Sequence, residues 1–362
     1  MLWFGVYLER KIEYRQLVYI LALFMLVQLF GMLVVYYFMP PSVVYQMESQ
    51  PVQPQSPMQA IYFLLYIVAG TAILLLFFKF YHGAVIYSLI EGIVVVSASF
   101  YLFLIILSSI FPQQSATYFV IAASLVIPVL LMLAKYKRPQ LRNTVAMIAS
   151  IGAGIVLGLV FSFFVAFIFM AIIAAYDYIS VFITRHMLAL GKQAVERNMA
   201  LLIGTSDVEL VPKSYLSSAA VKDFKKHFKV SSVHNKEVKS LIKKGAVPIP
   251  MQAALGTGDL AIPLMLAVSA YIYLHSYFIS SVIVFGAVIG LVFTMYMLKT
   301  YKIALPAIPP LFSFICIAMG VAFVAIGLFA LSLALFLTGI GVVGVMLATV
   351  RRIYRGKGRS VF

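Results

Sequence analysis

The chain has 362 residues, of which 64% are hydrophobic and only 10% are charged, and its net charge is +16. A soluble domain is about half apolar and about a quarter charged, so this composition excludes an ordinary soluble protein and indicates an integral membrane protein. In a soluble chain the positive charge would suggest a nucleic-acid partner, but its placement here follows membrane topology, and no nucleic-acid partner is expected.

Ten apolar runs are long enough to cross a bilayer as helices, for which about 18 residues suffice. They lie, in chain order, at residues 17–39, 60–78, 84–111, 117–134, 144–161, 163–183, 255–274, 277–298, 306–327 and 329–350. The nearly continuous stretches 144–183 and 303–350 each provide two crossings joined by a tight turn. The first run follows basic residues but has no small-residue cleavage site, so we expect a retained anchor rather than a cleaved signal peptide.

The basic residues predict the orientation of these helices. All 27 lysines and arginines lie before the first run, after the last run, or in every second connection, and the connection between the sixth and seventh runs holds the largest share. The other connections, such as 40–57 and 112–116, carry none. By the positive-inside rule, both termini and the long connection between the sixth and seventh runs are cytoplasmic, which is consistent with ten crossings.

The sequence therefore predicts an all-α polytopic membrane protein in three regions. Residues 1–183 form an N-terminal six-helix membrane region, residues 184–250 a basic cytoplasmic loop, and residues 251–362 a C-terminal membrane region. Within the loop, the basic and partly amphipathic segments 217–230 and 234–245 could lie on an anionic leaflet or be simply solvated. The sequence leaves the oligomeric state open, and it is compatible with a homo-oligomer.

Only three of the eleven acidic residues lie within the apolar runs, namely Glu91, Asp177 and Asp259. An ionisable group there costs roughly 3 kcal/mol on insertion scales and is therefore a functional candidate. With the helical rise of about 1.5 Å per residue, Asp177 lies about 12 Å from Arg185, eight residues later at the cytoplasmic face, and Asp259 lies about 10 Å from Gln252, seven residues earlier at the same face. Because these helices are consecutive and antiparallel, we expect the two carboxyls to lie at one level and to meet.

Two carboxyls a few ångströms apart cannot both ionise readily, so they share a proton. Such a pair can activate water, because the ionised member draws a proton from it while the neutral member protonates a carbonyl oxygen, as in aspartic proteases. The same acids would suit a proton- or cation-coupled transporter, so both functions stay open at this point. Glu91, about 13 Å deep, could line the water path, although a hydrogen-bonded acid between helices is the favoured interpretation.

The chain is locally interrupted near Asp259 and again at the ninth run. Gly256 and Gly258 precede Asp259, and Pro263 removes the helical hydrogen bond to the Asp259 carbonyl, which loosens the helix. Small residues here could equally serve ordinary helix packing. The stretch "LPAIPPL" at 305–311 has three prolines, which forbid a regular first turn. It is either a simple kink or an extended segment that could pair with a bound substrate strand.

Three motifs, in this order, resemble those of the GxGD intramembrane aspartic proteases, the presenilin and signal peptide peptidase family. They are Tyr176-Asp177 ("YD"), Gly256-Thr257-Gly258-Asp259 ("GxGD"), and Pro306-Ala307-Ile308, where the family has "PAL". The two aspartates are 82 residues apart, and Pro306 follows the second after 47 residues. The run "YDYISVFITRHM" at 176–187 is particularly similar to archaeal presenilin homologues.

The resemblance implies a presenilin-like bundle of nine or ten transmembrane helices that acts as an intramembrane aspartic endopeptidase. It implies that Asp177 and Asp259 are catalytic, that Tyr176, Gly256, Thr257 and Gly258 shape the site, and that Pro306, Ala307 and Ile308 help to seat the substrate. The expected substrates are transmembrane proteins or peptides, signal-peptide helices among them, in the lipid bilayer of a prokaryotic, archaeal cell membrane. No metal or organic cofactor is expected, since the five histidines lack metal-ligand spacing and Cys316 stands alone.

Overall fold

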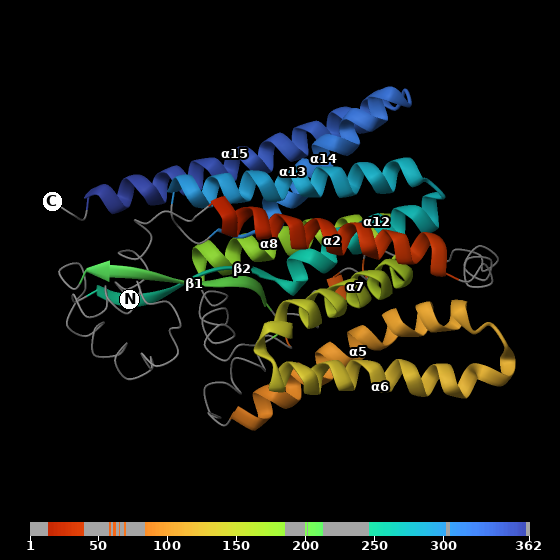
Figure 1. Ribbon diagram of the computed structural model, residues 1–362. Helices are drawn as coiled ribbons and strands as arrows, with labels where there is room; N and C mark the ends of the chain where they lie inside the picture. The colour runs from red at the N-terminus through yellow and green to blue at the C-terminus, as the bar shows by residue number, and fades with distance from the viewer. Residues whose placement is uncertain are drawn as a thin grey trace. The chain divides into compact units, whose positions relative to one another are not determined.

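The computed structural model describes residues 14–39, 58, 61–62, 65, 69, 84–184, 200, 202–212, 246–301 and 305–359. Within these residues, nine helices are long and apolar enough to cross a membrane (Figure 1). They are α2 (Tyr14–Phe38), α5 (Ala84–Ile110), α6 (Thr117–Lys137), α7 (Arg142–Val160), α8 (Phe163–Tyr178) with its π-helical end η4 (Ile179–Ile183), α12 (Thr257–Leu274), α13 (Tyr277–Tyr301), α14 (Ile308–Ala325) and α15 (Phe329–Arg359).

These helices correspond to nine of the ten predicted spans, and the prediction of a multi-pass membrane protein is confirmed. The second predicted span, 60–78, lies outside the described residues apart from single positions. Both predicted tight turns are present. Phe161 and Ser162 alone separate α7 from α8, and residues 326–328 separate α14 from α15. Gly327 has a φ of 86° in the second turn, a left-handed conformation that glycine adopts without steric cost.

The chain divides into two compact units, residues 1–203 with 255–362, and residues 204–254. The strands β1 (Leu202–Pro212) and β2 (Ala246–Gly256) pair in a two-stranded sheet. This sheet was not predicted by the all-helical interpretation. Pro248 and Pro250 explain why no helix forms here, since proline disfavours helix at its own position and at the one before. The strand crosses the predicted boundary between residues 250 and 251, and the three-region division stays a prediction. Segments 217–230 and 234–245 lie outside the described residues.

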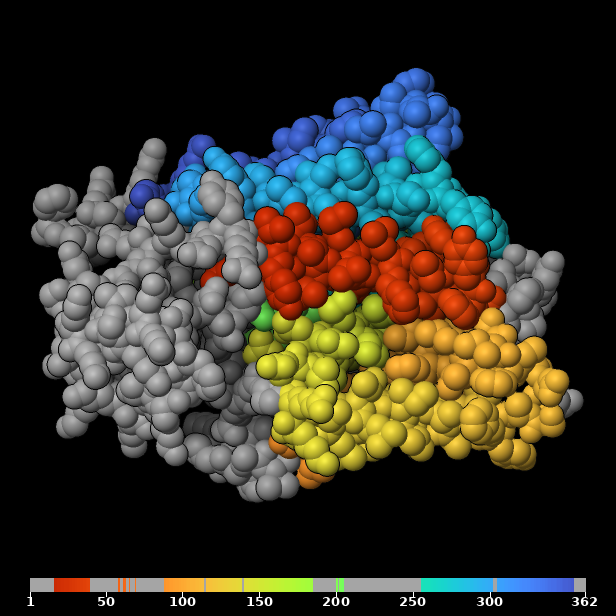
Figure 2. All heavy atoms as spheres, viewed as in Figure 1, coloured from red at the N-terminus to blue at the C-terminus, as the bar shows by residue number. Residues whose placement is uncertain are grey.

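Helix α12 is the central helix of the larger unit, where it contacts α2, α7, α8 and α13. Nearly every residue from Leu260 to Ala270 is buried. Close approach of α7 depends on Gly158, because a Cβ there would lie 2.6 Å from the Val268 side chain. Small residues let membrane helices pack closely, which matters where lipid provides no hydrophobic driving force. Figure 2 shows α2, in red, lying between α7 and α13 on one face of this unit.

Helices α5 and α6 pack against each other and carry a buried ion pair. The Lys135 ammonium on α6 donates to Oε1 of Glu91 on α5, and the Ala200 backbone N–H donates to the same oxygen. Glu91 is only 2% exposed and Lys135 only 4%. Lys135 was predicted to lie in a connection, because the predicted span ended at 134. That boundary was wrong, since α6 continues to Lys137 and its lysine is neutralised by an acid from α5.

We expect Glu91→Gln to destabilise the protein, because it leaves the Lys135 ammonium buried without a counter-charge. Breaking a buried ion pair by removing one partner typically costs about 3–5 kcal/mol. The double substitution Glu91→Gln with Lys135→Met should recover most of that loss, since no charge is then left unpaired. Thermal unfolding in detergent micelles measures both effects. A Glu91→Gln protein as stable as the parent would show that the ion pair does not stabilise this helix pair.

Candidate active site

Asp177 lies one residue before the end of α8, and its side chain is only 6% exposed. The backbone N–H of Ile308 donates to Oδ2 of Asp177 at 3.2 Å, and the Ala307 backbone also hydrogen-bonds this carboxyl. Asp177 and Ile308 are 131 residues apart in the chain. The "YD" motif and the proline motif, recognised separately in the sequence, are therefore in direct contact.

The start of α14 explains why its backbone is free to bind a carboxyl. Ala307 is the N-cap and Ile308 the first helical residue, so their N–H groups have no partner within the helix. Pro309 and Pro310 follow and have no N–H to offer. The positive end of the helix dipole adds a favourable interaction with a negative charge. The irregular stretch predicted for 305–311 is shorter than expected, because prolines are tolerated in a first helical turn and α14 begins at Ile308.

Asp259 lies in the first turn of α12 and accepts a hydrogen bond from the chain that enters this helix. The Gly256 backbone N–H donates to Oδ2 of Asp259 at 3.2 Å, as in a capping box. We predicted a helix from residue 255 and estimated the depth of Asp259 from a helical path through Gln252. That path was wrong, because β2 includes Gln252 and extends to Gly256, and α12 begins at Thr257.

The two glycines of the GxGD motif differ in what surrounds them. A Cβ on Gly256 would lie 3.2 Å from Oδ2 of Asp259, so a side chain there would crowd the carboxyl. A Cβ on Gly258 would meet no atom within 4 Å. Gly256 therefore leaves room for the Asp259 carboxyl, whereas Gly258 leaves open space beside it.

The carboxyls of Asp177 and Asp259 lie close enough to interact electrostatically. Each one also accepts a backbone N–H at the start of a helix, α14 for Asp177 and α12 for Asp259. Tyr176 precedes Asp177 and is partly buried, and Pro306, Ala307 and Ile308 are all buried. The structure thus brings two acids from distant parts of the chain to the point where two helices begin.

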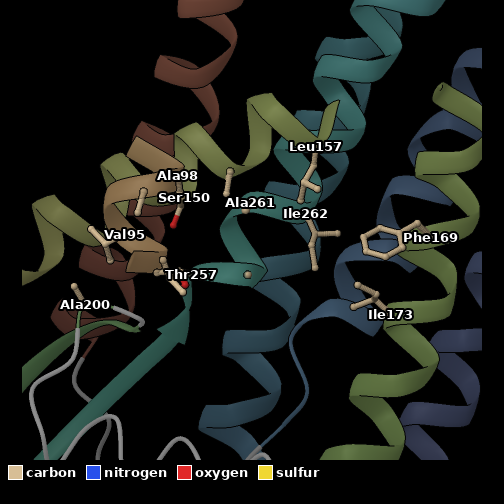
Figure 3. Close-up of a pocket in the computed structure, with 14 residues that line it drawn as sticks. Val95, Ala98, Ser150, Leu157, Phe169, Ile173, Ala200, Thr257, Ala261 and Ile262 are labelled. Atoms are coloured by element: carbon tan, nitrogen blue, oxygen red, sulfur yellow. The ribbon is translucent and has the colours of Figure 1, made fainter. Parts of the chain in front are cut away.

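A pocket of about 240 Å³ opens beside the GxGD motif (Figure 3). Thr257 and Gly258 line it together with apolar and small residues of α5, α7, α8 and α12 and with Ala200. Figure 3 shows the side chains of Val95, Ile173 and Ile262 around this space. The pocket is thus an apolar space next to Asp259, of a size that would hold a side chain.

Glu91 is not brought into this arrangement. Its carboxylate is bound by Lys135 and by the Ala200 N–H, as the ion pair between α5 and α6 requires. Lys135 could have been found from the sequence, since it and Glu91 are opposite charges near matching ends of consecutive helices. In the part of the chain that the structure describes, no three histidine, cysteine, aspartate or glutamate side chains are grouped as metal ligands would be.

Gln28 also contributes to this region, although it was not predicted to do so. This residue of α2 is fully buried, and its Nε2 donates to the Leu260 carbonyl at 2.9 Å, one residue after Asp259. Pro263 has already removed the helical donor from the neighbouring Asp259 carbonyl. Gln28 therefore ties α2 to the interrupted first turns of α12. A glutamine in the middle of an apolar run was the available signal.

The chain is similar to a known protein family and to solved structures. Residues 21–328 match the family described as signal-peptide peptidase, presenilin aspartyl protease. A solved structure described as a presenilin family intramembrane aspartate protease, in space group C222, has the same fold, with a TM-score of 0.52 and 16% identity over 84% of this chain and 96% of that one. A second, in space group P2, gives a TM-score of 0.48 and 18% identity over 88% and 96%. No curated protein matches the chain.

The family match includes all three motifs and extends over most of the chain. It decides between the two functions that the intramembrane acids left open, in favour of proteolysis and against transport. The chain belongs to the signal-peptide peptidase and presenilin family of aspartyl proteases, and it is an intramembrane aspartic endopeptidase.

Proposed function

We propose that Asp177 and Asp259 are the catalytic pair of this protease. The observation that carries the proposal is that their carboxyls interact with each other while each accepts a backbone N–H at a helix start. In the reaction, the ionised carboxylate draws a proton from a water molecule, which attacks the scissile carbonyl carbon. The neutral carboxyl protonates the carbonyl oxygen.

The other motif residues act by shaping this site. Gly256 leaves space for the Asp259 carboxyl, and Thr257 and Gly258 line the adjacent pocket. Tyr176 packs beside Asp177 on α8, where it is partly buried. Pro306, Ala307 and Ile308 have two functions. The backbone of Ala307 and Ile308 binds the Asp177 carboxyl. The non-helical residues 305–307 offer backbone hydrogen-bonding groups to a bound substrate.

The substrates we propose are transmembrane segments, including the signal-peptide helices that remain in a membrane. A helix hides its carbonyls in internal hydrogen bonds, so the segment must unwind before water can attack it. Glycine in such a segment eases this unwinding, because its helix propensity is about 1 kcal/mol lower than that of alanine. The apolar pocket beside Thr257 and Gly258 would accept one apolar side chain of the extended segment. No nucleic acid and no cofactor takes part, and a homo-oligomer remains compatible with the chain.

We further propose that the protein resides in a prokaryotic, archaeal cell membrane with both termini and the loop at 184–250 in the cytoplasm. The distribution of basic residues along the sequence supports the orientation. The similarity of residues 176–187 to archaeal presenilin homologues supports the archaeal membrane. Substrates would then reach the aspartates from within the membrane. Water would reach them from the cytoplasmic side.

The catalytic assignment predicts that Asp177→Asn and Asp259→Asn each abolish cleavage of a labelled transmembrane peptide. Loss of one acid–base group typically costs a factor of about 10²–10⁴, so we expect at least a 100-fold fall in rate. The assay uses purified protein in liposomes, with peptide products measured by mass spectrometry. Glu48→Gln, which removes an acid from the predicted outer connection 40–57, is the control and should cleave normally. Full cleavage by either asparagine variant would refute the assignment.

The crowding at Gly256 predicts that Gly256→Ala lowers the rate while leaving the fold intact. The new methyl group would displace the Asp259 carboxyl by a few tenths of an ångström. Misplacement of a catalytic group by about 1 Å can cost about 100-fold, so the expected loss is smaller than that but measurable. Gly344→Ala on α15 is the matched control, because a Cβ there meets no atom within 4 Å. Equal rates for both variants would contradict the role of Gly256.

The orientation predicts which connections an impermeant reagent can reach. In a variant carrying Cys316→Ala, Ser42→Cys should react with a membrane-impermeant maleimide on intact cells, since 40–57 is predicted to be outside. Ser218→Cys, in the basic loop, should react only after the membrane is permeabilised. Labelling of residue 218 on intact cells would show that the orientation is inverted.

A further inference from the structure

Helix α15 lies wholly outside the part of the chain that matches the family. The match ends at residue 328, and α15 begins at Phe329. The helix nevertheless packs against α14, which begins at the proline motif (Figure 1). It is also long and apolar enough to cross the membrane on its own. Helix α15 therefore lies outside the family match and still contacts a helix of the candidate active site.

The second half of α15 contributes to a buried cluster next to the site. Met346 and Val350 of α15 pack with Met297 of α13, and we call these three residues the α15 cluster. Phe182, in the π-helical end of α8, packs against this cluster, and so does Leu305, the residue before the proline motif. The cluster therefore touches both chain segments that position Asp177.

A hydrogen bond joins α15 to the residue that follows Asp177. The hydroxyls of Tyr178 and Thr349 are 2.6 Å apart. Thr349 also donates its hydroxyl proton to the Val345 carbonyl at 2.9 Å. Because a threonine hydroxyl has a single proton, Tyr178 must be the donor and Thr349 the acceptor in the contact between the two helices.

Tyr178 is well placed to transmit this contact to Asp177. It is the last residue of α8, and the π-helical turn η4 begins directly after it. A π-helical turn is a rare, locally irregular conformation that needs support from its surroundings. The Tyr178 ring also packs edge-on against Phe182, with ring centroids 5.1 Å apart. Both residues are thus held by α15, one by the hydroxyl of Thr349 and the other by the α15 cluster.

We propose that Tyr178 and Thr349 are positioning residues, through which α15 holds the end of α8 so that the Asp177 carboxyl stays against the first N–H groups of α14. The proposal rests on the catalytic role proposed for Asp177. It gives α15 a part in the reaction, although that helix carries none of the three motifs.

The test is Thr349→Val, which removes the accepting hydroxyl and keeps the shape of the side chain. We expect kcat to fall about fivefold to tenfold with KM unchanged, which corresponds to about 1–1.4 kcal/mol for one hydrogen bond. Thr349→Ser, which keeps the hydroxyl, should restore kcat. Thr338→Val is the matched control, because Thr338 is an exposed residue of α15 whose hydroxyl bonds the Ala334 carbonyl of the same helix. It should cleave like the parent.

A double-mutant cycle with Tyr178→Phe shows whether the two hydroxyls act together. The double variant should be no slower than the slower single variant, since both changes remove the same hydrogen bond. Additive losses, failure of Thr349→Ser to restore kcat, or a loss confined to Tm would each overturn the proposal. Asp177→Asn in the same assay separates the two proposals. If it is inactive and Thr349→Val is fully active, only the positioning role fails, whereas an active Asp177→Asn refutes both.

Discussion

The site depends on one electrostatic arrangement, in which two carboxyls are held at the beginnings of two helices inside an apolar bundle. A lone charge at this depth is costly, and bringing a second like charge near it is costlier. The N–H groups at a helix start and the positive end of its dipole offset part of that cost without adding a cation. For Asp177 the donors come from α14, and for Asp259 from the strand end that leads into α12. A basic side chain would neutralise the carboxyls, whereas backbone N–H groups stabilise them and leave them able to exchange protons.

This arrangement constrains how the helices pack, because the end of α8 and the starts of α12 and α14 must meet. Close packing of small residues makes such convergence possible. A Cβ on Gly290 of α13 would lie 2.7 Å from the Leu311 Cα, so α13 contacts the first turns of α14 backbone to backbone. Gly154 of α7 has the same relation to α12, since a Cβ there would lie 2.9 Å from the Ala261 carbonyl oxygen. In both cases the glycine faces a residue about one turn after the start of a helix, and that start binds a carboxyl.

The sequence predicted the features that depend on lipid and on local patterns. The spans were close to the observed helices because hydropathy alone decides which segments can cross a bilayer. Features that depend on distant partners were missed or misplaced. Lys135 was assigned to a connection because its partner Glu91 lies 44 residues earlier in the chain and was not considered with it. The last residues of the strand before Asp259, from Gln252 to Gly256, were taken for the start of the helix. The contacts of Gln28 with Leu260 and of Tyr178 with Thr349 join residues more than 170 positions apart, which no local pattern encodes.

The two carboxyls also differ in what fixes them. Asp259 is held by Gly256, three residues earlier in the chain, so its geometry is set locally by the strand-to-helix turn. Asp177 is held by Ile308, far away in the sequence, so its geometry depends on how α8 and α14 are packed against each other. Changes in remote packing should therefore disturb Asp177 before Asp259. This difference gives a physical reason why additional contacts, such as those of α13 and α15, gather around α14 and the end of α8.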